Sequence, residues 1–168
     1  MITAAAFIQA VATAAKPWAS LYSDSKMLQT GFAFLHLGGL LAAAGFAVAA
    51  DRATLRARRR PAAEQAVFLS ELDATHLPVL AGLALVVATG LAMMLADVDN
   101  LLPSPVFWLK MGAFVLLLAN GATLQRAGAR LQREETNPRR WRALTHAAVR
   151  SVVLWTVTLF LGTVLTAA

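Results

Sequence analysis

The chain alternates long apolar stretches with short polar segments. Four stretches approach the roughly 20 apolar residues that a helix needs to cross about 30 Å of hydrocarbon. They cover about residues 27–50, 77–96, 106–124 and 147–168. Because backbone polar groups must be satisfied internally in lipid, stretches of this length are expected to be helices. The pattern predicts an all-α integral membrane protein, a four-helix bundle over residues 26–168.

The first 25 residues differ from these four stretches. "MITAAAFIQAVATAA" looks like a signal peptide but lacks the positively charged start that such peptides carry. We interpret residues 1–25 as an N-terminal interfacial helix and a turn, with Ile2, Phe7, Ile8 and Val11 facing lipid. A short fifth spanning helix is the alternative.

Composition agrees with a lipid environment. Of the 168 residues, 58% are hydrophobic and 14% are charged, whereas about a quarter of the residues of a typical soluble domain are charged. A soluble fold of this size would lack the polar residues to cover so much apolar surface. The chain has no cysteine, which excludes disulfides and thiolate metal sites.

The net charge of +6 is unevenly distributed. Eleven of the fifteen basic residues lie in two short stretches between apolar segments, which we expect to be loops: Arg52, Arg56, Arg58, Arg59, Arg60, Arg126, Arg130, Arg133, Arg139, Arg140 and Arg142. By the positive-inside rule these loops are cytoplasmic, and both termini lie on the periplasmic side of a bacterial inner membrane. Trp108 and Trp141 then suit the outer and inner aromatic belts. This distribution argues against a nucleic-acid partner.

Small residues recur at four-residue spacing in the first span. Gly38 and Ala42 form one such pair, and Gly39 and Ala43 form another. Small residues four apart let helix backbones approach closely in lipid. We interpret them as packing positions within the bundle, with a homo-oligomer as the alternative.

Ionisable residues within or beside the spans are the candidates for chemistry, because such groups are costly in a membrane. They are His36, His76, His146, Lys110 and Arg150. His76 and His146 lie at the cytoplasmic ends of their spans. His36 is about 21 Å from the cytoplasmic boundary, at about 1.5 Å per residue, and close in depth to Lys110. The sequence therefore predicts two separate groups.

The first group is a candidate haem b site. His76 and His146, as metal ligands, could bind the haem iron axially from facing helices. Arg142 and Arg150 could meet the propionates, and Asp73, one turn before His76, could fix the tautomer of the ring. Structural histidines at the membrane interface are the alternative.

The second group is a candidate quinone site on the outer side. Gly38 and Gly39 follow His36 closely and leave room for a planar headgroup, and Lys110 could hydrogen-bond a quinone carbonyl. A lysine that extends to outer phosphates is the alternative.

Other chemistries have weaker support. Met93, Met94 and Met111 lie towards the outer face and could bind cuprous copper, although methionine is also a common core filler. The sequence contains no Gly-rich phosphate loop, nucleophile elbow or His-Glu metalloprotease signature. No span contains a carboxylate within its apolar stretch. We do not expect this chain to be an enzyme by itself.

Three segments resemble a known group of proteins: "FLHLGGLLAAAGFAVAADRATLR", "THLPVLAGLALVVATGLAMMLADVDNLLPSPVFWLKM" and "SVVLWTVTLFLGTVL". They are similar to small bacterial inner-membrane proteins distantly related to copper-resistance protein D (CopD-like) and to b-type cytochrome membrane domains. The similarity covers most of residues 27–168. His36 in "LHLGG" and Lys110 in "FWLKM" match best, whereas the methionine-histidine cluster of CopD is missing.

The leading hypothesis is a small membrane subunit that binds haem b or borders a quinone site. It would exchange electrons with other membrane or periplasmic redox subunits. The alternatives are a cofactor-free accessory subunit that anchors a larger complex and, third, copper transport.

Overall fold

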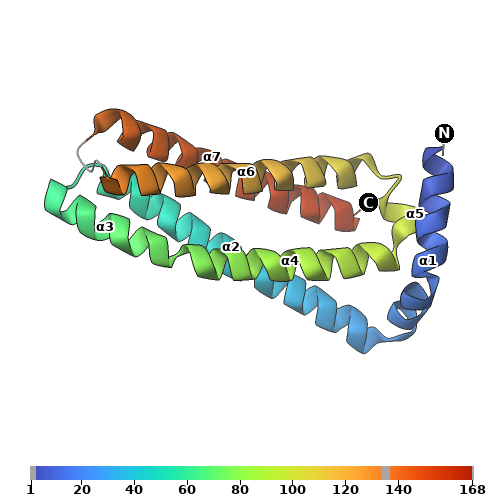
Figure 1. The fold of residues 1–168 in the computed structure, drawn as a ribbon. Helices are drawn as coiled ribbons and strands as arrows, with labels where there is room; N and C mark the ends of the chain where they lie inside the picture. Colours follow the sequence, from blue (N-terminus) through green and yellow to red (C-terminus); the bar gives the residue numbers. More distant parts are fainter. Residues whose placement is uncertain (1–2, 134–136, 168) are drawn as a thin grey trace.

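The computed structural model describes residues 3–133 and 137–167, and the described chain is helical with no strand. Its helices are α1 (Ala4–Asp24), α2 (Lys26–Ala57), α3 (Ala62–Ala74), α4 (His76–Ala96), α5 (Val98–Leu101), α6 (Pro105–Arg133) and α7 (Pro138–Ala167). In Figure 1, α2, the α3–α4 segment, α6 and α7 run along the same bundle. The predicted all-α fold is confirmed.

Four helical segments are long and apolar enough to cross a membrane. They are Lys26–Ala57, Ala62–Ala96, Pro105–Gln132 and Pro138–Ala167. With 32 residues, α2 is about 48 Å long at 1.5 Å per residue. This length exceeds the roughly 30 Å of hydrocarbon. The protein is therefore a four-helix membrane bundle whose helices continue beyond the apolar layer.

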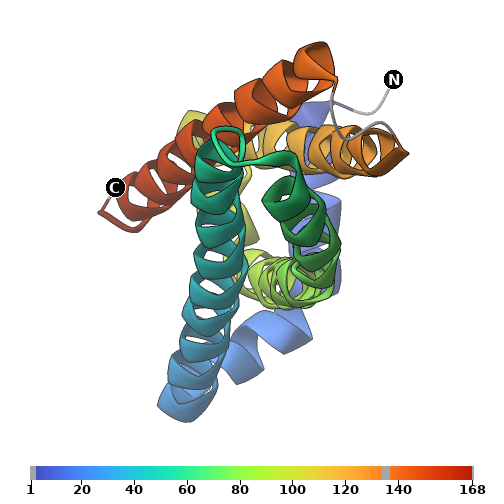
Figure 2. The same cartoon turned by 90° about the vertical axis from the view of Figure 1, so that its left-hand side faces the viewer.

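The two ends of the bundle differ. One end holds the connection at residues 58–61, the C-terminal end of α6 and the N-terminal end of α7. We call it the arginine end. At the other end α1 lies crosswise over the bundle, in contact with α4, α5 and α2 (Figure 1). Along the bundle, α2 packs against α4 and α7, and α6 packs against α7 (Figure 2).

The segment 62–96 is interrupted between α3 and α4 at Thr75. Pro78 has no N–H to donate to the carbonyl of Ala74, which weakens the helix at this point. At the same break the Thr75 hydroxyl donates to the carbonyl of Leu72, at 2.7 Å. As a result α3 leaves the axis of α4 and packs against α6.

Aromatic side chains fix α1 to the end of the bundle. The Trp18 indole N–H donates to the carbonyl of Ala92 in α4, at 2.7 Å. The Trp18 ring also packs against Tyr22 and Phe32, with centroids 5.8 and 5.4 Å away. The chain turns at Ser25 alone, because α1 continues past Pro17 to Asp24. The sequence "KPWASLYSDSK" suggests a longer turn over this segment, and that expectation is wrong, because the segment is helical to Asp24.

The predicted lipid-facing residues of α1 are partly exposed. Phe7 is exposed, whereas Ile8 and Val11 are half-buried. The prediction for Ile2 lies outside the described residues. The four candidate spans do not include α1.

Two apolar cores stabilise the bundle. Within the membrane-spanning part, Ala43, Leu117 and Trp155 pack together. At the arginine end the core consists of Ala57, Leu69, Leu131, Trp141 and Leu144. This second core joins the ends of α2, α3, α6 and α7.

The prediction that Trp141 lies in the inner aromatic belt is wrong. Trp141 is only 4% exposed and packs against Phe68, with ring centroids 6.5 Å apart. Trp108, by contrast, is 58% exposed, and its indole N–H donates to the carbonyl of Leu102. One tryptophan is therefore a core residue and the other lies on the surface.

Glycine allows α2 and α4 to approach closely. A Cβ atom added at Gly82 would lie 2.9 Å from the backbone N of Ala43 and from the carbonyl O of Gly39. A Cβ atom at Gly38 or Gly45 would meet nothing within 4 Å. Gly39 and Ala43 therefore serve packing within the bundle, as small residues at this spacing commonly do.

This contact predicts opposite effects for two Gly→Ala substitutions in neighbouring helices. Gly82→Ala should lower the free energy of unfolding by about 1–3 kcal/mol, because the backbones must separate. Gly45→Ala should be neutral or stabilising, since alanine favours a helix. Thermal unfolding in detergent micelles measures both. Equal changes in the two variants would contradict the close contact.

A second prediction concerns the core at the arginine end. Trp141→Ala should cost about 3–5 kcal/mol of unfolding free energy, as expected for a buried aromatic side chain. Trp108→Ala should cost about 1 kcal/mol or less, because it removes one hydrogen bond from an exposed ring. Unfolding curves of the two variants, followed by circular dichroism, compare them. A larger loss for Trp108→Ala would argue against the buried core.

Candidate functional site

Polar side chains are buried at several points of the bundle interior. Those of the described residues are Asp51, Thr54, Thr89, Asn120, Ser151 and Thr158. Polar side chains in membrane helices carry a cost and commonly face the interior or a functional site. Their hydrogen bonds show which of them have partners in the bundle.

His36 is held against α4 by a hydrogen bond to Thr89. The imidazole Nδ1 lies 2.9 Å from the Thr89 hydroxyl oxygen. That hydroxyl donates its only hydrogen to the carbonyl of Leu85, at 2.6 Å, so it must accept from the ring. This network assigns the proton to Nδ1 and leaves a lone pair on Nε2. The ring also has a hydrogen-bond contact with the Val86 backbone.

The glycine that accommodates the His36 ring is in α4. A Cβ atom at Gly90 would lie 3.2 Å from the imidazole Cε1. Gly39 is instead packed against Gly82 and Val86, and Gly38 borders open space. Gly39 therefore leaves no room for a planar headgroup, whereas the open space at Gly38 is compatible with one, and a headgroup at Gly38 stays a prediction.

Lys110 of α6 lies close enough to His36 for an electrostatic interaction. Its ammonium nitrogen Nζ lies beside α7, because a Cβ atom added at Gly162 would be 3.6 Å from it. Thr158 lies one turn from Gly162 on the same face of α7. It is 4% exposed, and its hydroxyl oxygen has no partner among the described residues. We call His36, Thr89, Gly90, Lys110 and Gly162 the His36–Lys110 site. The Thr158 hydroxyl is its neighbour along α7.

The hydrogen-bond donors and acceptors of this site could match those of a small polar ligand. The Nε2 atom of neutral His36 is an acceptor, and the Lys110 ammonium is a donor. The unpaired hydroxyl of Thr158 offers both functions. Four helices contribute residues to the site, and all four belong to the candidate membrane spans.

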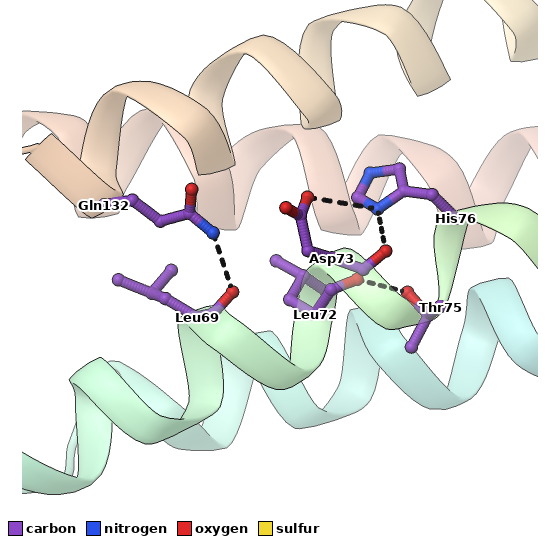
Figure 3. A network of polar contacts seen from close by, with 6 residues as sticks. All are labelled: Leu69, Leu72, Asp73, Thr75, His76 and Gln132. Atoms are coloured by element: carbon purple, nitrogen blue, oxygen red, sulfur yellow. Dashed lines mark hydrogen bonds and ion pairs between the residues drawn. The ribbon is translucent and has the colours of Figure 1, made fainter.

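His76 lies at the break between α3 and α4. Its Nδ1 donates to the backbone carbonyl of Asp73, at 3.1 Å, and lies 3.8 Å from the Asp73 carboxylate. Figure 3 shows the His76 ring beside Asp73, and Gln132 of α6 donating to the carbonyl of Leu69 further along α3. The structure therefore brings the predicted pair of His76 and Asp73 together.

The other residues of the predicted haem site lie on the outside of α7. His146, Arg142 and Arg150 are all exposed. The main partners of α7 are α6 and α2, and the main partner of α4 is α2. Nor do the described residues contain a cluster of three or more His, Cys, Asp or Glu suited to a metal ion. Haem at this position stays a prediction.

A buried carboxylate was missed by the sequence analysis. Asp51 is 4% exposed, and its carboxylate lies close enough to the Ser151 side chain of α7 for a hydrogen-bonding interaction. Its Oδ2 has no partner among the described residues. A signal was present, because Asp51 continues the four-residue spacing of Gly39 and Ala43 along one face of α2.

Ser151 should stabilise this buried carboxylate measurably. Ser151→Ala removes the side-chain hydrogen bond to Asp51 and should cost about 1–3 kcal/mol of unfolding free energy. Thr156→Ala is the matched control, because the exposed Thr156 hydroxyl bonds only the carbonyl of Val152 in its own helix. Chemical denaturation in micelles measures both. If the control loses as much as Ser151→Ala, the bond to Asp51 contributes little.

Fold and site define a class of protein, an α-helical membrane bundle with a polar site among its spans. Comparisons of the chain with protein-family models, with curated proteins and with solved structures found no match.

Proposed function

We propose that this protein is a small membrane subunit that binds a quinone at the His36–Lys110 site and serves electron transfer with a redox partner. The observation that carries the proposal is the hydrogen bond from His36 Nδ1 to Thr89. It leaves Nε2 as an acceptor among membrane-spanning helices, with the Lys110 ammonium in electrostatic range.

The two side chains complement both redox forms of such a ring. A quinone, when bound, supplies two-electron, two-proton chemistry. Lys110 would donate a hydrogen bond to a ring carbonyl, whereas His36 Nε2 would accept one from a ring hydroxyl. Thr89 keeps the imidazole in the required tautomer, as an orienting partner does for a catalytic histidine. The electrons would come from a separate redox subunit.

The exposed position of His146 favours this site over haem b at His76 and His146. Copper transport would need several soft ligands that converge. A cofactor-free accessory subunit is the main competitor, because buried polar residues also serve packing in membrane bundles.

The proposal includes an orientation in a bacterial inner membrane. The arginine end would face the cytoplasm, and both termini would face the periplasm, because basic loops remain on the cytoplasmic side. A redox partner would then meet the His36–Lys110 site from the side of α1.

Quinone titration tests the proposal. The purified protein in lipid nanodiscs should bind a short-chain ubiquinone, measured by quenching of its tryptophan fluorescence. Lys110→Met and His36→Leu should each weaken binding about tenfold or more, since each removes one strong hydrogen bond. His76→Leu is the matched control and should bind like the original protein.

Other outcomes would overturn the proposal. Affinity that is unchanged in folded Lys110→Met and His36→Leu would place the quinone elsewhere. A Soret absorption band that disappears in His76→Ala or His146→Ala would favour haem b. A colourless, folded preparation that binds no quinone would favour the accessory subunit.

A further inference from the structure

One face of α7 is exposed along the length of the helix. It is basic at the arginine end and apolar towards the C-terminus. At the arginine end it carries Arg142, His146 and Arg150, each one turn from the next, and all three are exposed. Towards the C-terminus the exposed residues include Val153, Val157 and Phe160. At 3.6 residues per turn, these six side chains fall within an arc of about 100°. We call them the α7 stripe.

The opposite face of α7 forms part of the bundle. Trp155, Ala147 and Ser151 of that face are buried, and α6 and α2 are the main helices packed against it. The α7 stripe is therefore the side that the bundle leaves to the lipid.

No ion pair among the described residues neutralises the cationic part of the stripe. The segment Pro138–Ala167 contains no acidic residue. Among the described residues, the ion pairs join Arg60 to Glu64 and His76 to Asp73, and neither involves the stripe. Two guanidinium groups and an imidazole on consecutive turns can together hold one phosphate, which arginine binds through paired N–H donors.

The position of Arg150 matches the phosphate level of a bilayer. From Ser151 to Ala167 the helix contains no charged residue. These residues span about 25 Å at 1.5 Å per residue, close to the thickness of the hydrocarbon layer. Arg150 therefore lies at the edge of this layer, and Val153, Val157 and Phe160 lie within it.

We propose that the α7 stripe binds an anionic phospholipid. Its phosphate would lie between Arg142, His146 and Arg150, and an acyl chain would follow Val153, Val157 and Phe160. The excess of positive charge favours a lipid with net negative charge over a zwitterionic one. Arg142 and Arg150, which the sequence suggested for haem propionates, and His146, which it suggested as an iron ligand, would thus meet the phosphate of a lipid. The stripe is separate from the His36–Lys110 site, so each proposal can fail alone.

Lipid binding can be measured on the purified protein with phosphatidylglycerol as the probe. Native mass spectrometry from detergent micelles counts bound lipids and gives their apparent affinity. The double variant Arg142→Gln/Arg150→Gln should lose about thirty-fold in affinity for phosphatidylglycerol, since each arginine near a membrane surface contributes appreciably. Phosphatidylcholine should bind the original protein weakly and respond little to the variant.

Arg58→Gln/Arg59→Gln is the matched control, because it removes two exposed arginines at the same end of the bundle but outside the stripe. It should change the affinity less than threefold. An equal loss in both double variants would overturn the proposal in favour of general charge attraction. Displacement of phosphatidylglycerol by millimolar inorganic phosphate would overturn the lipid assignment in favour of a phosphate site. Circular dichroism and the unfolding temperature should be unchanged in both variants, because these side chains are exposed.

Discussion

The close packing of α2 against α4 is the contact on which the rest of the structure depends. Gly39 and Ala43 bring the α2 backbone directly against Gly82. His36 lies on the same side of α2, so this contact also presses its ring against Thr89 and Gly90. A wider separation of the two helices would break the hydrogen bond that determines the tautomer of His36. The packing of the helices and the chemistry of the site therefore have one cause.

The same helix connects two polar regions that are separated by an apolar layer. His36 lies towards the α1 end, and Asp51, fifteen residues further along α2, is about 22 Å away at 1.5 Å per residue. Between them Ala43, Leu117 and Trp155 form the membrane core. Protons for the proposed quinone site would therefore come from the α1 end. Asp51 and Ser151 instead link α2 to α7 near the arginine end.

The helices of this bundle have two apolar sides with different roles. In α7, one side packs into the protein with Trp155, and the other exposes Val153 and Phe160 to lipid. Lipid tails are as apolar as these side chains, so hydrophobicity does not distinguish the two sides. Within the apolar layer, buried polar residues show which side faces inward, as Ser151 does in α7.

The sequence alone determined the helical class, the four spans and the concentration of arginines in two short stretches between the spans. These features follow from the length and local composition of single segments, which the hydrocarbon thickness constrains directly. It also placed His36 and Lys110 at a similar depth, since depth depends only on the rise per residue. The tertiary structure alone decided which helix faces meet. It buried Asp51 and Trp141, placed Gly90 rather than Gly38 beside the His36 ring, and left His146 outside. Such choices depend on pairwise contacts between helices, and in a lipid solvent an apolar sequence pattern carries little information about them.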